Sequence, residues 1–222
     1  MKVSSPIVIF DLDGTLINSK NQIFEAMISA REVLGMLDLT EEFIGQHLGL
    51  PVRQLIPEQD LSQDFVDGLV LEFRRFLKIA ILKHNEVFPG AIELIDVLRA
   101  NGLKIGIATT KPQLQAEMVV HNSPLKGLID FVQGTDNFPP KPSPEVIKRV
   151  LETFLNPPAI MIGDRVEDLQ AATASGIPSI GIAQSAHDEE MLILHGASLT
   201  YTDMQEAFKD SKSIMQLIKT TV

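Results

Sequence analysis

The sequence contains no cysteine, no apolar run of about 20 residues and no excess of basic side chains. The absence of cysteine excludes disulfide bonds, thiolate nucleophiles and cysteine-ligated zinc. The absence of a long apolar run argues against a membrane-spanning helix. The N-terminal segment MKVSSPIVIF has too short an apolar run for a signal peptide. We therefore expect a cytoplasmic protein with no membrane partner.

The charge balance is acidic, with 19 Lys and Arg against 29 Asp and Glu and a net charge of -10. A protein that binds duplex nucleic acid needs a basic face to displace counterions, so we expect no nucleic-acid partner. A small anionic substrate is still compatible with this balance, because a local group of donors can bind it. With 222 residues, the chain can form one core plus a smaller domain.

Short apolar runs rich in β-branched residues recur along the chain, and helical patterns lie between most of them. The runs span residues 7–10, 104–109, 129–134, 159–163 and 179–183. They are apolar throughout rather than alternating, which is typical of strands covered on both faces of a parallel sheet. Helical patterns cover residues 89–102 and 143–155, the latter with a Ser cap before Pro, and the stretch LQAATASG after GDRVED. This order predicts an α/β fold with a doubly wound, mainly parallel, Rossmann-like sheet.

Residues 18–84 follow a different pattern, without strand-like runs. Apolar and long side chains recur there at helical intervals, namely Phe24, Met27, Ile28, Arg31 and Leu34, and later Phe65, Leu69, Phe73, Phe76 and Ala80. We expect an all-helical domain at 18–84, inserted into a catalytic core of residues 1–17 and 85–222.

Residues suited to chemistry follow several predicted strands. Asp11 and Asp13 follow the first run, and Thr109 ends the second with Thr110 behind it. Asp164 follows the run 159–163, and further candidates are Lys141, in a proline-rich loop, and Asp168. In open α/β sheets ligands bind beyond the carboxyl ends of the strands. We therefore expect these side chains to converge on one crevice.

The acids in this set suit phosphoryl transfer. Asp11 can attack phosphorus and form an aspartyl-phosphate. A carboxylate and a phosphate repel each other, so a cation is needed between them, and Asp11, Asp164 and Asp168 offer the hard oxygen ligands that Mg²⁺ prefers. Asp13 can protonate the leaving oxygen and later activate water.

The remaining candidates would hold the phosphoryl oxygens. Thr109 and Thr110 offer hydroxyls and Lys141 a point charge. Gly14 allows the backbone to bend closely around a phosphate, and the amides of Leu12 and Asp13 are further donors. Each residue alone also has a simpler interpretation. The two acids suit a turn, Thr109 an ordinary strand and Lys141 an exposed loop. Asp168 suits the first turn of a helix, where the dipole favours an acid.

The stretches FDLDGTL, IATTKP, PPKPSPEVI and IGDRVEDLQAA resemble, in order, the four motifs of the haloacid dehalogenase-like hydrolase superfamily. Residues 6–17 and 86–183 are similar to its phosphoglycolate phosphatase-like members. The resemblance implies a Rossmann-like fold and a helical cap that closes over the crevice. It also implies metal binding through the backbone carbonyl of Asp13. The roles it implies are nucleophile for Asp11, acid/base for Asp13, phosphate binding for Thr109 and Lys141, and metal binding for Asp164 and Asp168.

Residues 45–54, GQHLGLPVRQ, form a break punctuated by glycine within the helical region. In relatives such a segment faces the crevice and helps to choose the substrate. Gln46, His47 and Arg53 are therefore candidates for specificity, against the alternative that they are merely exposed loop residues.

The sequence thus predicts a Mg²⁺-dependent phosphatase acting on a small phosphorylated metabolite, such as phosphoglycolate, a sugar phosphate or a nucleotide, as a monomer or homodimer. A phosphomutase of the same fold is an alternative. From another class, a receiver-like signalling or binding module also places Asp, Thr and Lys around Mg²⁺. Its phosphoaccepting Asp is expected on a later strand, and it has no place for a helical insertion.

Overall fold

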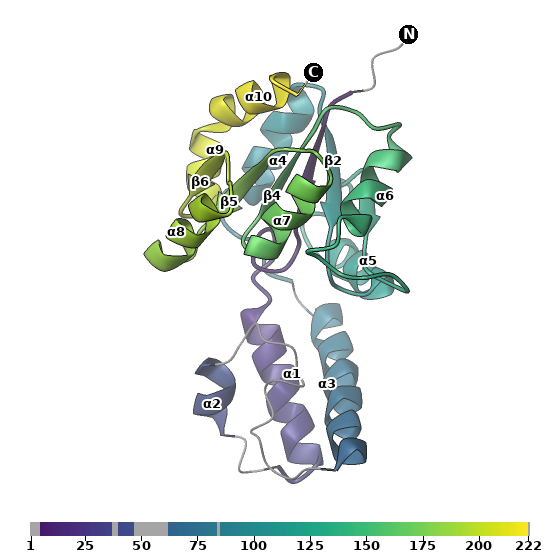
Figure 1. Cartoon of the computed structure of the whole chain (residues 1–222). Coiled ribbons are helices and arrows are strands. Elements are labelled where there is room, and N and C mark those ends of the chain that lie inside the picture. The colour runs from purple at the N-terminus through teal and green to yellow at the C-terminus, as the bar shows by residue number, and fades with distance from the viewer. Residues whose placement is uncertain (1–4, 37–39, 47–61, 84, 222) are drawn as a thin grey trace. The chain divides into compact units, whose positions relative to one another are not determined.

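The computed structural model describes residues 5–36, 40–46, 62–83 and 85–221, which form two compact units (Figure 1). Met1–Asn18 and Glu86–Val222 make up one of them, here called the sheet unit, and Ser19–Asn85 make up the other, the helical unit. Among the helices of these described residues, none combines the length and apolar character that a membrane crossing requires.

The sheet unit contains a parallel sheet with a central switch in strand order. Its strands are β1 (Ile7–Phe10), β2 (Lys104–Ala108), β3 (Phe131–Gln133), β4 (Ala159–Gly163), β5 (Ser179–Ile182) and β6 (Leu199–Tyr201). They lie in the order β3-β2-β1-β4-β5-β6, and every neighbouring pair is parallel. The order reverses at β1, where Phe10 lies opposite Ile107 of β2 and Ile162 of β4. This reversal is the point at which doubly wound sheets bind ligands.

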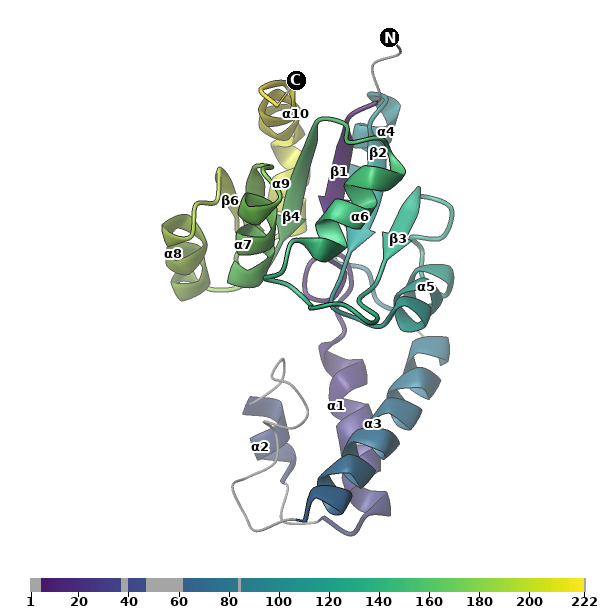
Figure 2. The same ribbon diagram turned by 45° about the vertical axis from the view of Figure 1, so that its right-hand side comes forward.

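Helices cover both faces of the sheet (Figure 2). On one face lie α4 (Ala91–Ala100), α9 (Met204–Lys209) and α10 (Ser211–Lys219), and on the other lie α6 (Glu145–Thr153) and α7 (Val166–Ala174). At the edges, α5 (Gln113–His121) packs beside β3, and α8 (Ala186–Leu194) beside β5 and β6. The double cover explains why every residue of β1 is fully buried.

The core between the sheet and α6 follows from the helical spacing of apolar residues. Val146, Ile147 and Val150 all point to the sheet, where they pack in one cluster with Ile7 and Ile9 of β1. Burying each such side chain contributes about 1.5–3 kcal/mol relative to leaving it exposed. This packing holds the strand that carries the first site residues.

The helical unit consists, in its described residues, of α1 (Lys20–Val33), α2 (Glu41–Gln46) and α3 (Gln63–Lys83). Helices α1 and α3 pack side by side (Figure 1). The side chains that they bury are Ala26, Met27 and Ala30 on α1, and Leu69, Phe73, Leu77 and Ile81 on α3. The helical spacing predicted for α3 is therefore wrong in its second half. The buried residues recur every four positions, which leaves Phe76 and Ala80 only half-buried.

The predicted fold class is confirmed, with a parallel Rossmann-like sheet and a helical second unit. The strand expected at 129–134 is wrong at its ends, since β3 spans only Phe131–Gln133. Asp130 N donates to Ile105 O at 2.8 Å, while Asp130 Oδ2 accepts from Ile105 N at 2.9 Å. The side-chain oxygen of Asp130 thus takes the place of a main-chain acceptor for Ile105 N, and β3 begins only at Phe131.

The predicted start of α6, with Ser143 as the cap and Pro144 as the first helical residue, is one residue too early, because Glu145 is its first residue and Pro144 its N-cap. Ser143 Oγ still accepts from Glu145 N, at 3.4 Å. The helix predicted after GDRVED begins within that motif instead, at Val166. In both places the local hydrogen bonds of the loop, rather than apolar spacing, determine the first turn.

Candidate active site

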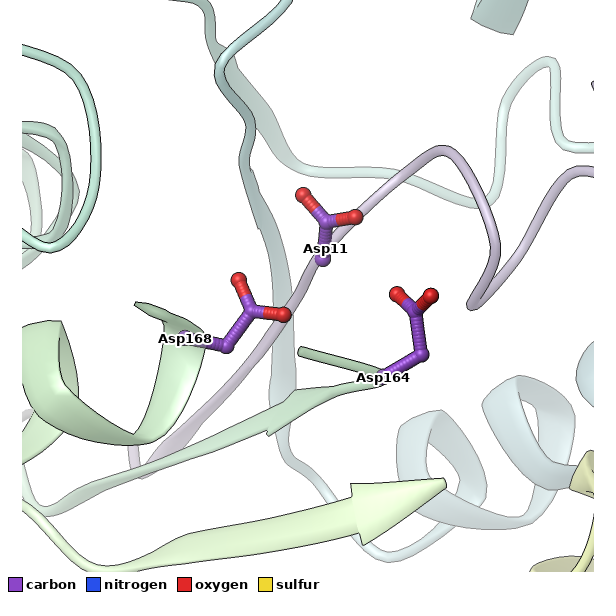
Figure 3. A group of neighbouring side chains, drawn as sticks. All are labelled: Asp11, Asp164 and Asp168. Atoms are coloured by element: carbon purple, nitrogen blue, oxygen red, sulfur yellow. The ribbon is translucent and has the colours of Figure 1, made fainter. Parts of the chain in front are cut away.

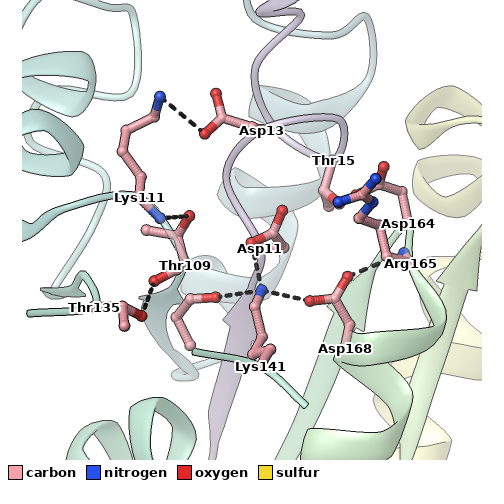
Figure 4. Close-up of polar contacts among 11 residues, drawn as sticks. Asp11, Asp13, Thr15, Thr109, Lys111, Thr135, Lys141, Asp164, Arg165 and Asp168 are labelled. Carbon is pink, nitrogen blue, oxygen red and sulfur yellow. Dashed lines mark hydrogen bonds and ion pairs between the residues drawn. The ribbon is translucent and has the colours of Figure 1, made fainter. Parts of the chain in front are cut away.

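Four predicted site residues meet at the carboxyl edge of the sheet (Figure 4). Asp11 follows β1, Thr109 follows β2 and Asp164 follows β4, so the order of the strands makes their ends adjacent. Lys141 precedes α6 and reaches the same place, since its Nζ donates to Asp11 Oδ1 at 2.5 Å. Residues far apart in the sequence therefore form one polar cluster where open α/β sheets bind ligands.

The loop after β1 folds back tightly on itself. Leu16 N and Ile17 N both donate to Leu12 O, at 3.0 and 2.8 Å, and Gly14 N donates to Ile17 O at 2.9 Å. Leu12 is fully buried, and Gly14 has a φ of 91°, which is in the left-handed region that favours glycine. These bonds fix the backbone on both sides of Asp13.

Lys141 lies at the centre of the cluster with 3% of its side chain exposed. Besides Asp11, its Nζ donates to Ala108 O at 2.9 Å and to Asp168 Oδ1 (Figure 4). These bonds use all three donors of the ammonium group. A lysine this deeply buried is tolerated because two carboxylates and a carbonyl compensate its charge.

Two carboxyl groups of the cluster, those of Asp11 and Asp164, hold their protons more tightly than exposed ones. Burial, together with the charge of Asp168, raises the pKa of Asp11 to about 7, although Lys141 acts in the opposite direction. Burial and the charges of Asp11 and Asp168 raise the pKa of Asp164 to about 8. For Lys141, burial acts to lower the pKa, but both carboxylates outweigh it and the pKa lies above its ordinary value. The site thus has more negative charge than one ammonium can offset.

Asp11, Asp164 and Asp168 could together hold a metal ion, since one oxygen of each lies within 4.8 Å of the others (Figure 3). Carboxylate oxygens are the ligands that Mg²⁺ prefers, and a divalent cation would offset the excess charge. The donor set therefore fits such an ion. The hydrogen bonds of the three acids differ, however. Asp168 accepts from Lys141 through Oδ1 and from Arg165 N through Oδ2 at 3.0 Å, whereas Asp164 Oδ2 accepts from Gln184 over a longer 3.5 Å.

Thr109 is 1% exposed, and its N–H, carbonyl and hydroxyl are all hydrogen-bonded. Its N–H donates to Gln133 O at 3.0 Å, its carbonyl accepts from Thr135 Oγ1 at 2.8 Å, and its hydroxyl accepts from Lys111 N at 3.2 Å. Thr110, the next residue, is exposed. The end of β2 is thus clamped to the end of β3, which gives the Thr109 hydroxyl a fixed position.

Three residues without a predicted role also contact this cluster. Thr15 Oγ1 donates to Asp164 Oδ1 at 2.9 Å, and Lys111 Nζ lies 3.1 Å from Asp13 Oδ2. Gln184, just after β5, has its Nε2 at 3.5 Å from Asp164 Oδ2. Lys111 and Thr15 both stand within the quoted motifs, but their partners depend on loop conformations that residue spacing does not specify.

The specificity candidates cannot be placed in the same way. Gln46 is the last residue of α2, and its side chain lies outside what the structure describes. His47 and Arg53 lie outside the described residues altogether. Their role stays a prediction.

The fold and the cluster define an α/β enzyme whose reacting groups stand at the carboxyl edge of a parallel sheet. The chain belongs to the haloacid dehalogenase-like hydrolase family, whose sequence model matches residues 8–182. The resemblance seen in the four motifs is thereby confirmed.

Individual relatives support the same class. A phosphoglycolate phosphatase of Rhodobacter capsulatus is 30% identical over 187 residues, which are 79% of this chain and 83% of that protein. A phosphorylated carbohydrates phosphatase of Thermotoga maritima is 29% identical over 200 residues, covering 86% and 91%. A haloacid dehalogenase-like family hydrolase of Streptococcus pneumoniae has a solved structure with a TM-score of 0.78 and 26% identity, covering 93% of this chain and 98% of that one. These relatives place the chain among the phosphatases of the family.

Replacing Gly14 with Ala tests how closely the loop after β1 approaches Asp164. A Cβ at this position would lie 2.3 Å from Asp164 Oδ2, so the carboxylate must move. We expect phosphatase activity to fall about 100-fold, because displacements of about 1 Å in a reacting group have effects of that size. Gly102→Ala is the matched control, since Gly102 also has a positive φ but open space around its Cβ. Similar activity in both variants would contradict the prediction.

Proposed function

We propose that the protein is a Mg²⁺-dependent phosphatase that hydrolyses a small phosphomonoester through an aspartyl-phosphate on Asp11. One observation carries the proposal. The Asp11 carboxylate stands at the end of the central strand, in contact with Lys141 and in one cluster with Asp164 and Asp168. A carboxylate so placed can attack phosphorus when cationic groups offset its repulsion from the phosphate.

We assign Asp11 and Asp164 as the carboxylate ligands of Mg²⁺, with the backbone carbonyl of Asp13 added by the family resemblance. Asp168 is assigned a supporting role, because its Oδ1 is paired with Lys141 and its Oδ2 accepts from the Arg165 N–H at 3.0 Å, whereas Asp164 Oδ2 has a longer contact of 3.5 Å with Gln184. It contributes negative charge near the metal and holds the lysine in place. When bound, the ion supplies positive charge next to the transferring phosphoryl group.

The proposed reaction has two steps. In the first, Asp11 forms a bond to phosphorus, the bond from phosphorus to the ester oxygen breaks, and Asp13 donates a proton to the leaving oxygen. In the second, a water molecule donates a proton to Asp13 and attacks phosphorus, which releases inorganic phosphate and restores the Asp11 carboxylate. Asp13 thus ends the cycle in the protonation state in which it began.

Lys141 and Thr109 would bind the phosphoryl oxygens during both steps. All three donors of Lys141 are in use, one of them to Asp11. When Asp11 becomes esterified, its oxygen loses negative charge and becomes a weaker acceptor. We infer that this N–H of Lys141 then donates to the phosphoryl group, so that charge stabilisation follows the transferred phosphorus.

The substrate is proposed by class. Phosphoglycolate is the first compound to test, followed by sugar phosphates, nucleoside monophosphates and pyrophosphate. A phosphomutase would use the same groups but return the phosphoryl group to substrate, so phosphate on an added sugar rather than in solution would identify it. The receiver-like alternative is disfavoured, because the candidate phosphoaccepting Asp11 follows the first strand. A cytoplasmic location stays a prediction.

Metal binding at Asp11 and Asp164 predicts a stabilisation by Mg²⁺ that depends on pH. In the metal-free protein their pKa values are about 7 and about 8, so both carboxyl groups hold protons at lower pH. These protons must leave before the oxygens bind a cation, and affinity therefore falls as pH falls. We expect the rise in melting temperature on adding Mg²⁺ to be larger at about pH 8.5 than at about pH 6.

The matched variants are Asp164→Asn and Asp96→Asn, the latter at an exposed position of α4. The shift should disappear in the first and persist in the second. An equal shift at both pH values, or a full shift in Asp164→Asn, would contradict the assignment of this residue as a ligand.

A further inference from the structure

Lys111 forms the second ion pair of the site. It lies three residues beyond the end of β2, and its Nζ is 3.1 Å from Asp13 Oδ2. Only 8% of its side chain is exposed, while 27% of the Asp13 side chain is. Enclosing an ammonium to this extent is unfavourable unless anionic groups compensate it.

The two lysines of the site are bound to different acids. Lys141 donates to Asp11 and Asp168, whereas Lys111 pairs with Asp13. Figure 4 shows the two lysine ammonium groups apart, with the Asp11 side chain between them. Under the proposed function, Asp11 approaches phosphorus from one side, and the ester oxygen leaves from the opposite side, near Asp13. Lys111 is therefore the cation on the side of the leaving group.

We propose that Lys111 binds a second anionic group of the substrate, a carboxylate or phosphate carried by the leaving group close to the ester oxygen. This inference rests on the proposed function. An acid that protonates the ester oxygen must come within about 3 Å of it. If Asp13 Oδ2 carries this proton, Lys111 Nζ, 3.1 Å from Oδ2, is within about 6 Å of the same ester oxygen. An anionic group about two or three bonds away from the ester oxygen is thus within hydrogen-bond reach of the ammonium.

The ion pair also explains how an anionic substrate would be favoured over a neutral one. With a neutral leaving group, Lys111 stays bound to Asp13 and competes with the ester oxygen for this carboxyl group. With an anionic leaving group, Lys111 can exchange Asp13 for the substrate, and Asp13 is released to act on the ester oxygen. One exchange therefore both binds the substrate and orients the acid.

The experiment compares two esters that differ in one charge, phosphoglycolate and its amide, phosphoglycolamide. The quantity measured is the ratio of kcat/KM for the acid to kcat/KM for the amide. In the unmodified protein we expect this ratio to be well above one. Lys111→Met should lower it about 10- to 100-fold, because a hydrogen bond between charged groups is lost with only one of the two substrates. Lys111→Arg should retain most of the ratio.

Lys104→Met is the matched control. Lys104 begins the same strand and pairs with Asp130 at 2.8 Å, at the opposite end of β2 from the site. Its removal should leave the ratio as in the unmodified protein. Lys111→Met with equal losses on both esters would overturn the proposal and reduce Lys111 to a positioning residue for Asp13. A ratio near one in the unmodified protein would also overturn it. If the unmodified protein hydrolysed none of the three compounds, phosphoglycolate, its amide and an aryl phosphate, the proposed function itself would be overturned, and the role of Lys111 with it.

Discussion

Asp11→Asn is expected to lower phosphate release from an aryl phosphate by at least about 10⁴-fold, the loss typical of removing a nucleophile that forms a covalent intermediate. The amide keeps the size of the side chain but is a far weaker nucleophile. It can still accept from Lys141, whose Nζ lies 2.5 Å from Asp11 Oδ1, so the fold should persist. The measurement is steady-state phosphate release with saturating Mg²⁺.

Asp96→Asn makes the same chemical change on the exposed surface of α4 and should keep full activity. Melting temperatures of both variants show whether any loss of activity comes from unfolding. Activity within tenfold of the unmodified protein in Asp11→Asn would rule out this residue as the nucleophile.

Lys141→Met is expected to destabilise the protein as well as inactivate it. The change leaves Asp11 and Asp168 as buried carboxylates without their shared partner, and breaking a buried pair in this way costs about 3–5 kcal/mol. Activity should fall with it, because no ammonium group remains to stabilise the phosphoryl oxygens. The measurements are the free energy of unfolding, from urea denaturation, and phosphate release under folding conditions.

Lys104→Met provides the contrast, since Lys104 keeps 46% of its side chain exposed in its pair with Asp130. Exposed pairs contribute less than about 1 kcal/mol, so this variant should be almost as stable as the unmodified protein. Equal stability of Lys141→Met and Lys104→Met would contradict the prediction that Lys141 stabilises the fold by compensating two buried carboxylates.

The arrangement of the sheet could be predicted because buried parallel strands leave a strong signal. The runs ending before Asp11 and Asp164 are short but contain no polar side chain, and the polar residues that follow them must lie at one edge. Strand β6 has no such signal. It has only three residues, Leu199–Tyr201, one of which is Thr, and it pairs with β5 alone.

The pairings within the site could not be predicted from spacing. Lys111 reaches Asp13 because the loop after β1 folds back on itself, and Thr15 reaches Asp164 for the same reason. The two hydrogen bonds of Asp168 likewise depend on its place in the first turn of α7, where one oxygen accepts from the Arg165 N–H and the other from Lys141. Sequence motifs specify which residues are available, but loop conformation decides their partners.

The most direct test of the covalent mechanism uses the Asp13→Asn variant with an aryl phosphate. A good leaving group needs no proton, so Asp11 can still be phosphorylated, but no base remains at position 13 to activate water. We predict that acid quenching traps a phosphoryl group on the peptide that contains Asp11, and that the Asp11→Asn, Asp13→Asn double variant yields none. Turnover without a trapped phosphoenzyme, or a phosphoryl group on another residue, would contradict an aspartyl-phosphate at Asp11.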